Sequence, residues 1–160
     1  MRRTPWSRLL LVAAVVAAFS AAVLHLAESR GWLLVAPPPL ATVVMLGIAV
    51  VVGRLGWNVR QYVRGKRPGL DPLLAARTVV LATAAAYTGA VLTGWYTGHV
   101  LVVLGRLGHP PLRDFAISAA VAAAGAVVLA VAGVVAERWC EVPPSDDDNP
   151  PDGVSAGSPA

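Results

Sequence analysis

The chain alternates four long apolar stretches with short segments that hold most of its charged residues. The apolar stretches cover about residues 9–27, 38–57, 78–104 and 115–136, with Arg54 inside the second. A helix needs about 20 mainly apolar residues to cross the hydrocarbon layer of a membrane. The pattern therefore predicts an all-α integral membrane protein with four transmembrane helices in one domain, residues 1–140.

The first stretch has an alternative reading, because a basic start followed by an apolar run is also typical of a cleaved signal peptide. Ala18 and Ser20 could precede a cleavage site. The apolar run continues beyond that point to a spanning length, so a retained helix is favoured. The second stretch is the least regular, since it opens at the prolines of 37–39 and requires Arg54 to extend toward the interface.

The basic residues predict which side each end occupies. If the N-terminus is cytoplasmic, ten of the thirteen basic residues are cytoplasmic, and only Arg30, Arg106 and Arg113 are outside. This is the bias that cytoplasmic loops show. The tryptophans, which favour membrane interfaces, fall near the ends of the stretches: Trp6, Trp32, Trp57, Trp95 and Trp139. We expect both termini to be cytoplasmic.

Small residues recur every four positions in the third stretch, a spacing that allows close helix packing in membranes. They are Ala82, Ala86, Ala90, Gly94 and Gly98. The fourth stretch repeats the spacing at Ser118, Ala122, Ala126 and Ala130. We expect these two ridges to pack against each other. Tyr87 lies near the first ridge, and its hydroxyl is expected to bond to Ser118 or to a main-chain carbonyl.

The segment "GWYTGHV", residues 94–100, brings an indole and an imidazole next to the two glycines. At 100° per residue, Trp95 and His99 lie about 140° and about 180° from Ala90, the centre of the ridge. We expect both rings to be interfacial anchors that point away from the packing face. On this view Gly98→Leu lowers stability while His99→Leu melts normally. The alternative is that the stretch is a functional site.

Composition supports the membrane assignment and narrows the chemistry. The chain is 56% hydrophobic and 14% charged, with a mean hydropathy of +0.64. Its formal charge is +4, but the basic residues lie at the ends of apolar stretches and form no aromatic-interleaved patch, so nucleic acid is not an expected partner. Cys140 is the single cysteine. We expect no catalytic residues, no metal site and no cofactor.

The segments outside the apolar stretches predict two further features. Residues 54–77 form a basic loop that is expected to attract anionic lipid, and Asp71, before Pro72, is expected to cap the third helix. Residues 141–160 are rich in proline, aspartate, serine and glycine. We expect them to form a disordered acidic cytoplasmic tail.

The motifs "LDPLLAART", "GWYTGH" and "ERWCEVPP", together with the basic "VRGKRPGLDP" loop and the acidic end, carry a family resemblance. The chain resembles the actinobacterial domain of unknown function 3180 (DUF3180) family. The resemblance implies a small four-helix membrane protein and assigns no activity and no functional residues.

These observations favour a non-enzymatic packing or interaction component of the bacterial cell membrane, multi-pass, with a second copy or another membrane protein as partner. The alternative is an oligomeric small-solute transporter or channel subunit, whose polar path would require several copies. A membrane enzyme acting on lipid or prenyl substrates is a third class. It would require carboxylates or a metal set at the inner face, for which Asp71 and the tail acids are poor candidates.

Overall fold

The computed structural model describes residues 6–31, 37–63, 72–104, 108 and 110–140. This part of the chain is all-α and forms four helices: α1 (Trp6–Ser29), α2 (Pro39–Val63), α3 (Pro72–Val103) and α4 (Pro110–Trp139). Each helix is long and apolar enough to cross a membrane. The four predicted helices are thereby confirmed, whereas Asp71, Trp32 and the tail 141–160 lie outside the described residues.

Local sequence explains where the helices begin and end. Proline occupies the first position of α2, α3 and α4, where its fixed φ suits the helix and its missing N–H is not needed. At the end of α1, Gly31 has φ of 77° and its N–H donates to the Glu28 carbonyl over 2.9 Å. A glycine in this left-handed conformation is a common helix stop.

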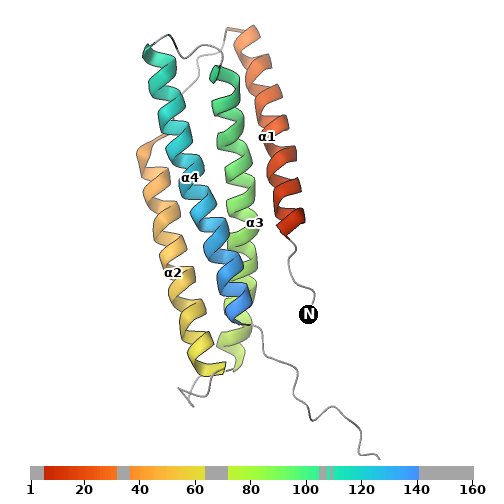
Figure 1. Ribbon diagram of the computed structural model, residues 1–160, viewed down its shortest axis with the longest axis vertical. Helices are drawn as coiled ribbons and strands as arrows, with labels where there is room; N and C mark the ends of the chain where they lie inside the picture. The colour runs from red at the N-terminus through yellow and green to blue at the C-terminus, as the bar shows by residue number, and fades with distance from the viewer. Residues whose placement is uncertain (1–5, 32–36, 64–71, 105–107, 109, 141–160) are drawn as a thin grey trace, which may run out of the picture.

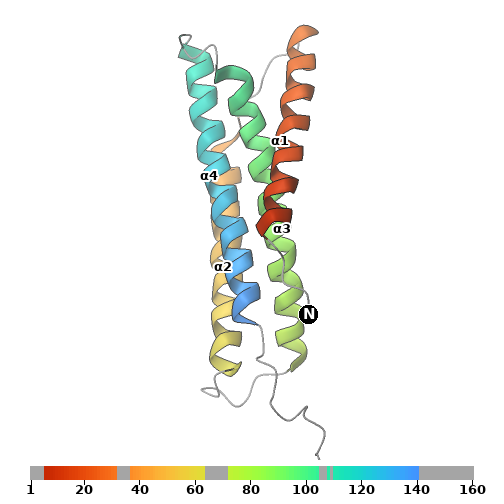
Figure 2. The same cartoon turned by 45° about the vertical axis from the view of Figure 1, so that its right-hand side comes forward.

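The helices run antiparallel in sequence order and form a bundle around α3 and α4, which make the most extensive helix pair (Figure 1). α1 packs on α3, whereas α2 packs mainly on α4 and less on α3. The backbones of α1 and α2 do not contact each other in the described helices. Figure 2 shows α1 on the opposite side of the α3–α4 pair from α2.

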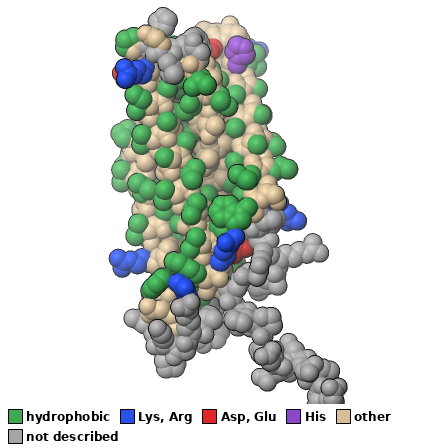
Figure 3. Space-filling model, in the orientation of Figure 1, with side chains coloured by type: hydrophobic (Ala, Val, Ile, Leu, Met, Phe, Trp, Pro, Cys, Tyr) green, Lys and Arg blue, Asp and Glu red, His purple; other side chains and the backbone are tan. Residues whose placement is uncertain are grey.

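The outer surface of the bundle is apolar along most of its length (Figure 3). Large side chains on every helix face outward, among them Leu10, Phe19, Val50, Val80 and Val121. α1 is the most exposed helix and α4 the most buried. Such a surface suits lipid better than water, because exposed apolar patches of this extent are rare on soluble monomers.

Charged side chains gather at the two ends of the bundle. We call the end where α2 finishes and α3 begins the basic end, and the other the opposite end. The described arginines nearest the basic end are Arg8, Arg54, Arg60, Arg77 and Arg138, whereas Arg30 and Arg113 lie near the opposite end. The described arginines are therefore divided five to two between the two ends, in the direction that the sequence predicts.

Candidate functional site

The α3–α4 interface depends on glycines that allow the two backbones to meet. A Cβ added at Gly133 would lie 2.5 Å from the Ala86 nitrogen and 2.7 Å from the Ala82 carbonyl oxygen. A Cβ added at Gly89 would overlap the backbone of Ala130. Ala82 and Ala86 are fully buried in this contact. Small residues here bring α3 and α4 closer than larger side chains would allow.

The sequence predicted that the α3 ridge faces α4 along its whole length. In the structure only part of the ridge does so. Ala82 and Ala86 contact α4, whereas Gly94 and Gly98 contact α1 instead. A row of residues spaced by four drifts about 40° around a helix at each step, so from Ala82 to Gly98 it winds by about 160°. The single ridge therefore serves two neighbours.

On α4, the predicted ridge also has more than one environment. Ala122 and Ala126 are buried, and Ala130 meets Gly89 through its backbone. The Ser118 hydroxyl donates over 2.8 Å to the carbonyl of Phe115 on the same helix. The Ser118 hydroxyl thus donates its hydrogen bond within α4 and not to Tyr87.

The α1–α3 junction is formed at Gly94 and Gly98. A Cβ at Gly94 would overlap the Ala13 carbonyl oxygen, and one at Gly98 would lie 2.7 Å from both Cβ and Oγ of Ser20. Ser20 is completely buried, and its hydroxyl donates to the Trp95 carbonyl over 3.0 Å. This bond crosses from α1 to α3 and satisfies a polar group that would be costly to leave unpaired in an apolar environment.

His99 is not the interfacial anchor predicted from sequence. Its side chain is 8% exposed, and its ring stacks on Phe115 of α4 with centroids 5.9 Å apart and an interplanar angle of 22°. The prediction was wrong because the angle from Ala90 assumed one packing face, whereas α3 has α1 and α4 on different sides at this level. His99 lies in the bundle between them.

The chemistry around His99 is that of a packing cluster. Nδ1 lies 2.9 Å from the Trp95 carbonyl oxygen and 3.5 Å from Ser20 Oγ. A carbonyl only accepts, so the short contact assigns the proton to Nδ1. Ser20 donates to the same carbonyl and not to the imidazole. A serine nucleophile would need the reverse arrangement, with its hydroxyl donating to a basic ring nitrogen.

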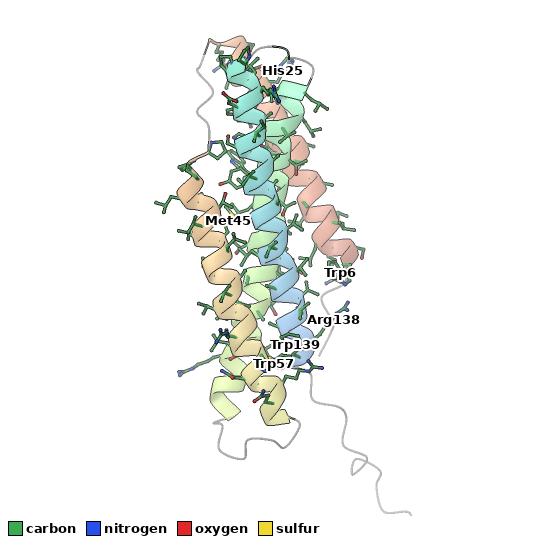
Figure 4. The ribbon with its side chains drawn as sticks, turned by 60° about the vertical axis from the view of Figure 1, so that its left-hand side comes forward. Trp6, His25, Met45, Trp57, Arg138 and Trp139 are labelled. Carbon is green, nitrogen blue, oxygen red and sulfur yellow. The ribbon has the colours of Figure 1, made fainter. Side chains whose placement is uncertain are left out.

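A second polar cluster lies at the basic end, where three side chains from α2 and α4 meet. The rings of Trp57 and Trp139 are 5.3 Å apart at 74°, an edge-to-face arrangement. The Arg60 guanidinium carbon lies 5.3 Å from the Trp57 centroid and 5.2 Å from the Trp139 centroid. We call these three residues the Arg60 cluster (Figure 4, which labels both indoles).

The neighbouring residue of α4 makes the matching contact with α1. The Arg138 guanidinium lies 5.6 Å from the centre of the Trp6 ring, and the two side chains approach each other in Figure 4. Consecutive residues at the end of α4, Arg138 and Trp139, thus contact side chains of α1 and α2 respectively. Burial raises the pKa of the adjacent Cys140 thiol. Within the described ranges, no three His, Cys, Asp or Glu side chains gather as a metal site would require.

The predicted tryptophan anchors divide between the two ends. Trp6, Trp57 and Trp139 lie toward the basic end, whereas Trp95 lies toward the opposite end with its ring 5.2 Å from that of His99. Trp6, Trp57 and Trp95 remain exposed enough to meet lipid headgroups, at 44%, 46% and 37% of their surface.

Sequence reasoning missed four residues that the structure makes important. Gly133 and Gly89 lie one position off the chosen rows, and the alanine-rich sequence offered several rows of equal quality. Arg60 was counted only as a topology signal, although the spacing of three from Trp57 places both on one helix face and could have indicated the contact. Ser20 gave no signal, because its partner is 75 residues away.

Comparison with known proteins gives a family and no activity. The family model described as "Protein of unknown function (DUF3180)" matches residues 9–144. Comparison with curated proteins and with solved structures gave no significant match. The matched range contains α2, α3 and α4, all of α1 except its first three residues, and both polar clusters.

Proposed function

Since this chain belongs to the DUF3180 family, whose description assigns no function, we propose a function from its own geometry. The protein is a non-enzymatic, multi-pass component of the bacterial cell membrane that packs through α1 against a second copy of itself or another membrane protein. Four helices of spanning length and apolar composition support the membrane location.

The observation that carries the proposal is the outward face of α1. Its inward face uses Ala13 and Ala17 to approach the α3 glycines. Its outward face repeats that spacing with Ala14, Ala18 and Ala22, all exposed. Small residues four apart allow the close helix contact by which membrane helices associate. α1 therefore offers a partner the same kind of surface by which α3 already holds it.

Cysteine cross-linking in native membranes tests this proposal. In a Cys140→Ser background, Ala18→Cys places a thiol on the outward face of α1, and Val50→Cys places one on the outward face of α2 as a matched control. We expect specific cross-links from residue 18 and none from residue 50. Equal cross-linking at the two positions, or none at either, would contradict packing through α1.

The same experiment distinguishes this proposal from the alternative, an oligomeric transporter or channel subunit. The buried polar side chains of the described residues are Ser20, Thr78 and His99. Thr78 lies near the start of α3, whereas His99 lies near its end beside Ser20 of α1, so no fully buried polar side chain of the described residues lies halfway along one copy. A channel requires several copies. Cross-links to a different protein without any between copies would exclude the channel and retain the interaction component.

We further propose that the basic end, with both termini, is cytoplasmic. The unequal division of arginines between the two ends supports this orientation. Labelling of single cysteines with an impermeant reagent tests it in intact cells, again with Cys140 replaced. We expect a cysteine at position 109 to react and one at position 145 to be protected. The reverse pattern would invert the topology.

A further inference from the structure

The Arg60 cluster holds a guanidinium in a fixed place at the basic end. Arg60 is half-buried, and its guanidinium carbon lies 5.2–5.3 Å from the centres of two indole rings. Those rings come from different helices and contact each other edge to face. Contact with two aromatic rings restricts a side chain that otherwise has many rotamers.

Contact with the rings leaves the hydrogen-bonding capacity of Arg60 largely unused. A guanidinium carries five N–H donors in its plane, and cation–π contacts engage the charge and not these donors. The planar fork matches two oxygens of a phosphate group. A guanidinium oriented in advance loses less rotamer freedom when such a group binds.

The depth of the cluster indicates where the phosphate would come from. Trp57 and Trp139 lie near the ends of helices that are long and apolar enough to cross a membrane. Indoles favour the headgroup level of a bilayer, and the groups present there are phosphates of lipids. Arg54, Arg77 and Arg138 share this end of the bundle, so an anionic headgroup is favoured over a zwitterionic one.

We propose that Arg60, held against Trp57 and Trp139, binds the phosphate of an anionic phospholipid headgroup. This inference rests on the membrane location of the four helices. It is independent of packing through α1, because a lipid can bind at α2 and α4 of a single copy. Failure of the α1 cross-links would leave it intact, and its own failure would leave the cross-links intact.

The experiment measures lipid binding to the full-length protein purified in mild detergent. Phosphatidylglycerol is titrated by native mass spectrometry and by thermal shift, with phosphatidylcholine and inorganic phosphate in parallel. Wild-type protein should bind phosphatidylglycerol more tightly than phosphatidylcholine. Arg60→Gln should weaken this binding by more than about fivefold, because loss of one near-surface charge alone accounts for about fivefold and loss of the oriented guanidinium fork adds to it.

Arg54→Gln is the matched control, because Arg54 is an exposed arginine on the same helix. It should weaken binding by no more than about fivefold, the diffuse effect of one near-surface cation. Equal losses for the two variants would indicate diffuse attraction and overturn the site. Equal stabilisation by inorganic phosphate would overturn the assignment to lipid. If Arg60→Gln does not fold, Arg60→Lys decides: it retains the charge without the planar fork, so binding equal to wild type would overturn the proposal.

Discussion

Adding one methyl group at Gly98 tests a close contact between α1 and α3. In Gly98→Ala, the new Cβ would lie 2.7 Å from Cβ and Oγ of Ser20 and 2.9 Å from the Ala17 carbonyl oxygen. These atoms belong to or lie next to the α1 backbone, so rotation of a side chain cannot relieve the overlap. α1 must move away by about 0.7 Å, the difference between a 2.7 Å and an ordinary 3.4 Å contact.

The expected cost combines three effects. Overpacking costs about 1–3 kcal/mol. Disturbing the Ser20 bond to the Trp95 carbonyl costs about 0.6 kcal/mol, the average for hydrogen bonds between membrane helices. Replacing glycine by alanine within a helix stabilises the folded state by about 1 kcal/mol, because the unfolded chain then has less backbone entropy. We expect Gly98→Ala to lower the free energy of unfolding by a net amount of about 0.5–2.5 kcal/mol.

Gly47→Ala is the control, because it makes the same replacement inside α2 where no atom lies within 4 Å of the new Cβ. It should be neutral or stabilise the protein by up to about 1 kcal/mol. The free energy of unfolding of both variants would be measured by equilibrium unfolding in mixed micelles. The melting temperature in mild detergent would serve as a second measure. If Gly98→Ala is as stable as Gly47→Ala, α1 does not pack on Gly98 as described.

Three further predictions follow from the polar clusters and the single thiol. His99→Leu removes the Nδ1 bond and the ring stack on Phe115, so it should lower the melting temperature in detergent. His25→Leu alters an exposed side chain and should leave the melting temperature unchanged. Equal melting temperatures for the two variants would refute the buried position of His99. Trp139→Leu removes an aromatic pair and a cation–π contact and should cost about 1–2 kcal/mol in the same unfolding assay, and no change would show that the Arg60 cluster does not hold α2. Burial raises the pKa of Cys140, so less thiolate is present at neutral pH. Maleimide should therefore label Cys140 more slowly in the folded than in the denatured protein, and the midpoint of the labelling rate against pH should be higher in the folded protein. An equal midpoint in the two states would contradict this.

The elements of the fold were readable from sequence because length and hydropathy alone decide them. Four apolar runs, the second of which contains Arg54, predicted four helices, whereas α4 begins at Pro110, before the apolar run at 115. The helix neighbours were not readable in the same way. The row from Ala82 to Gly98 was treated as one face, although it winds around α3 and ends against α1.

The position of His99 shows the same limit for a single side chain. Its angle of about 180° from Ala90 follows from helix geometry, but an angle shows which residues share a face and not what covers that face. Phe115 follows it by sixteen residues across a turn, and Ser20 precedes it by 79. In a chain with so many alanines, no pattern in the sequence identifies partners at those distances.

The separation of α1 from α2 has a consequence for how the bundle assembles. They are the first two helices along the chain, yet their backbones do not contact each other among the described residues. Neither helix can bury a face against the other, so within the chain each depends on α3 and α4 for its contacts. Assembly of the bundle thus depends on the C-terminal half, because α3 and α4 supply the surfaces on which α1 and α2 pack. Two fragments divided between α2 and α3 would together provide every helix surface that packs in the described bundle.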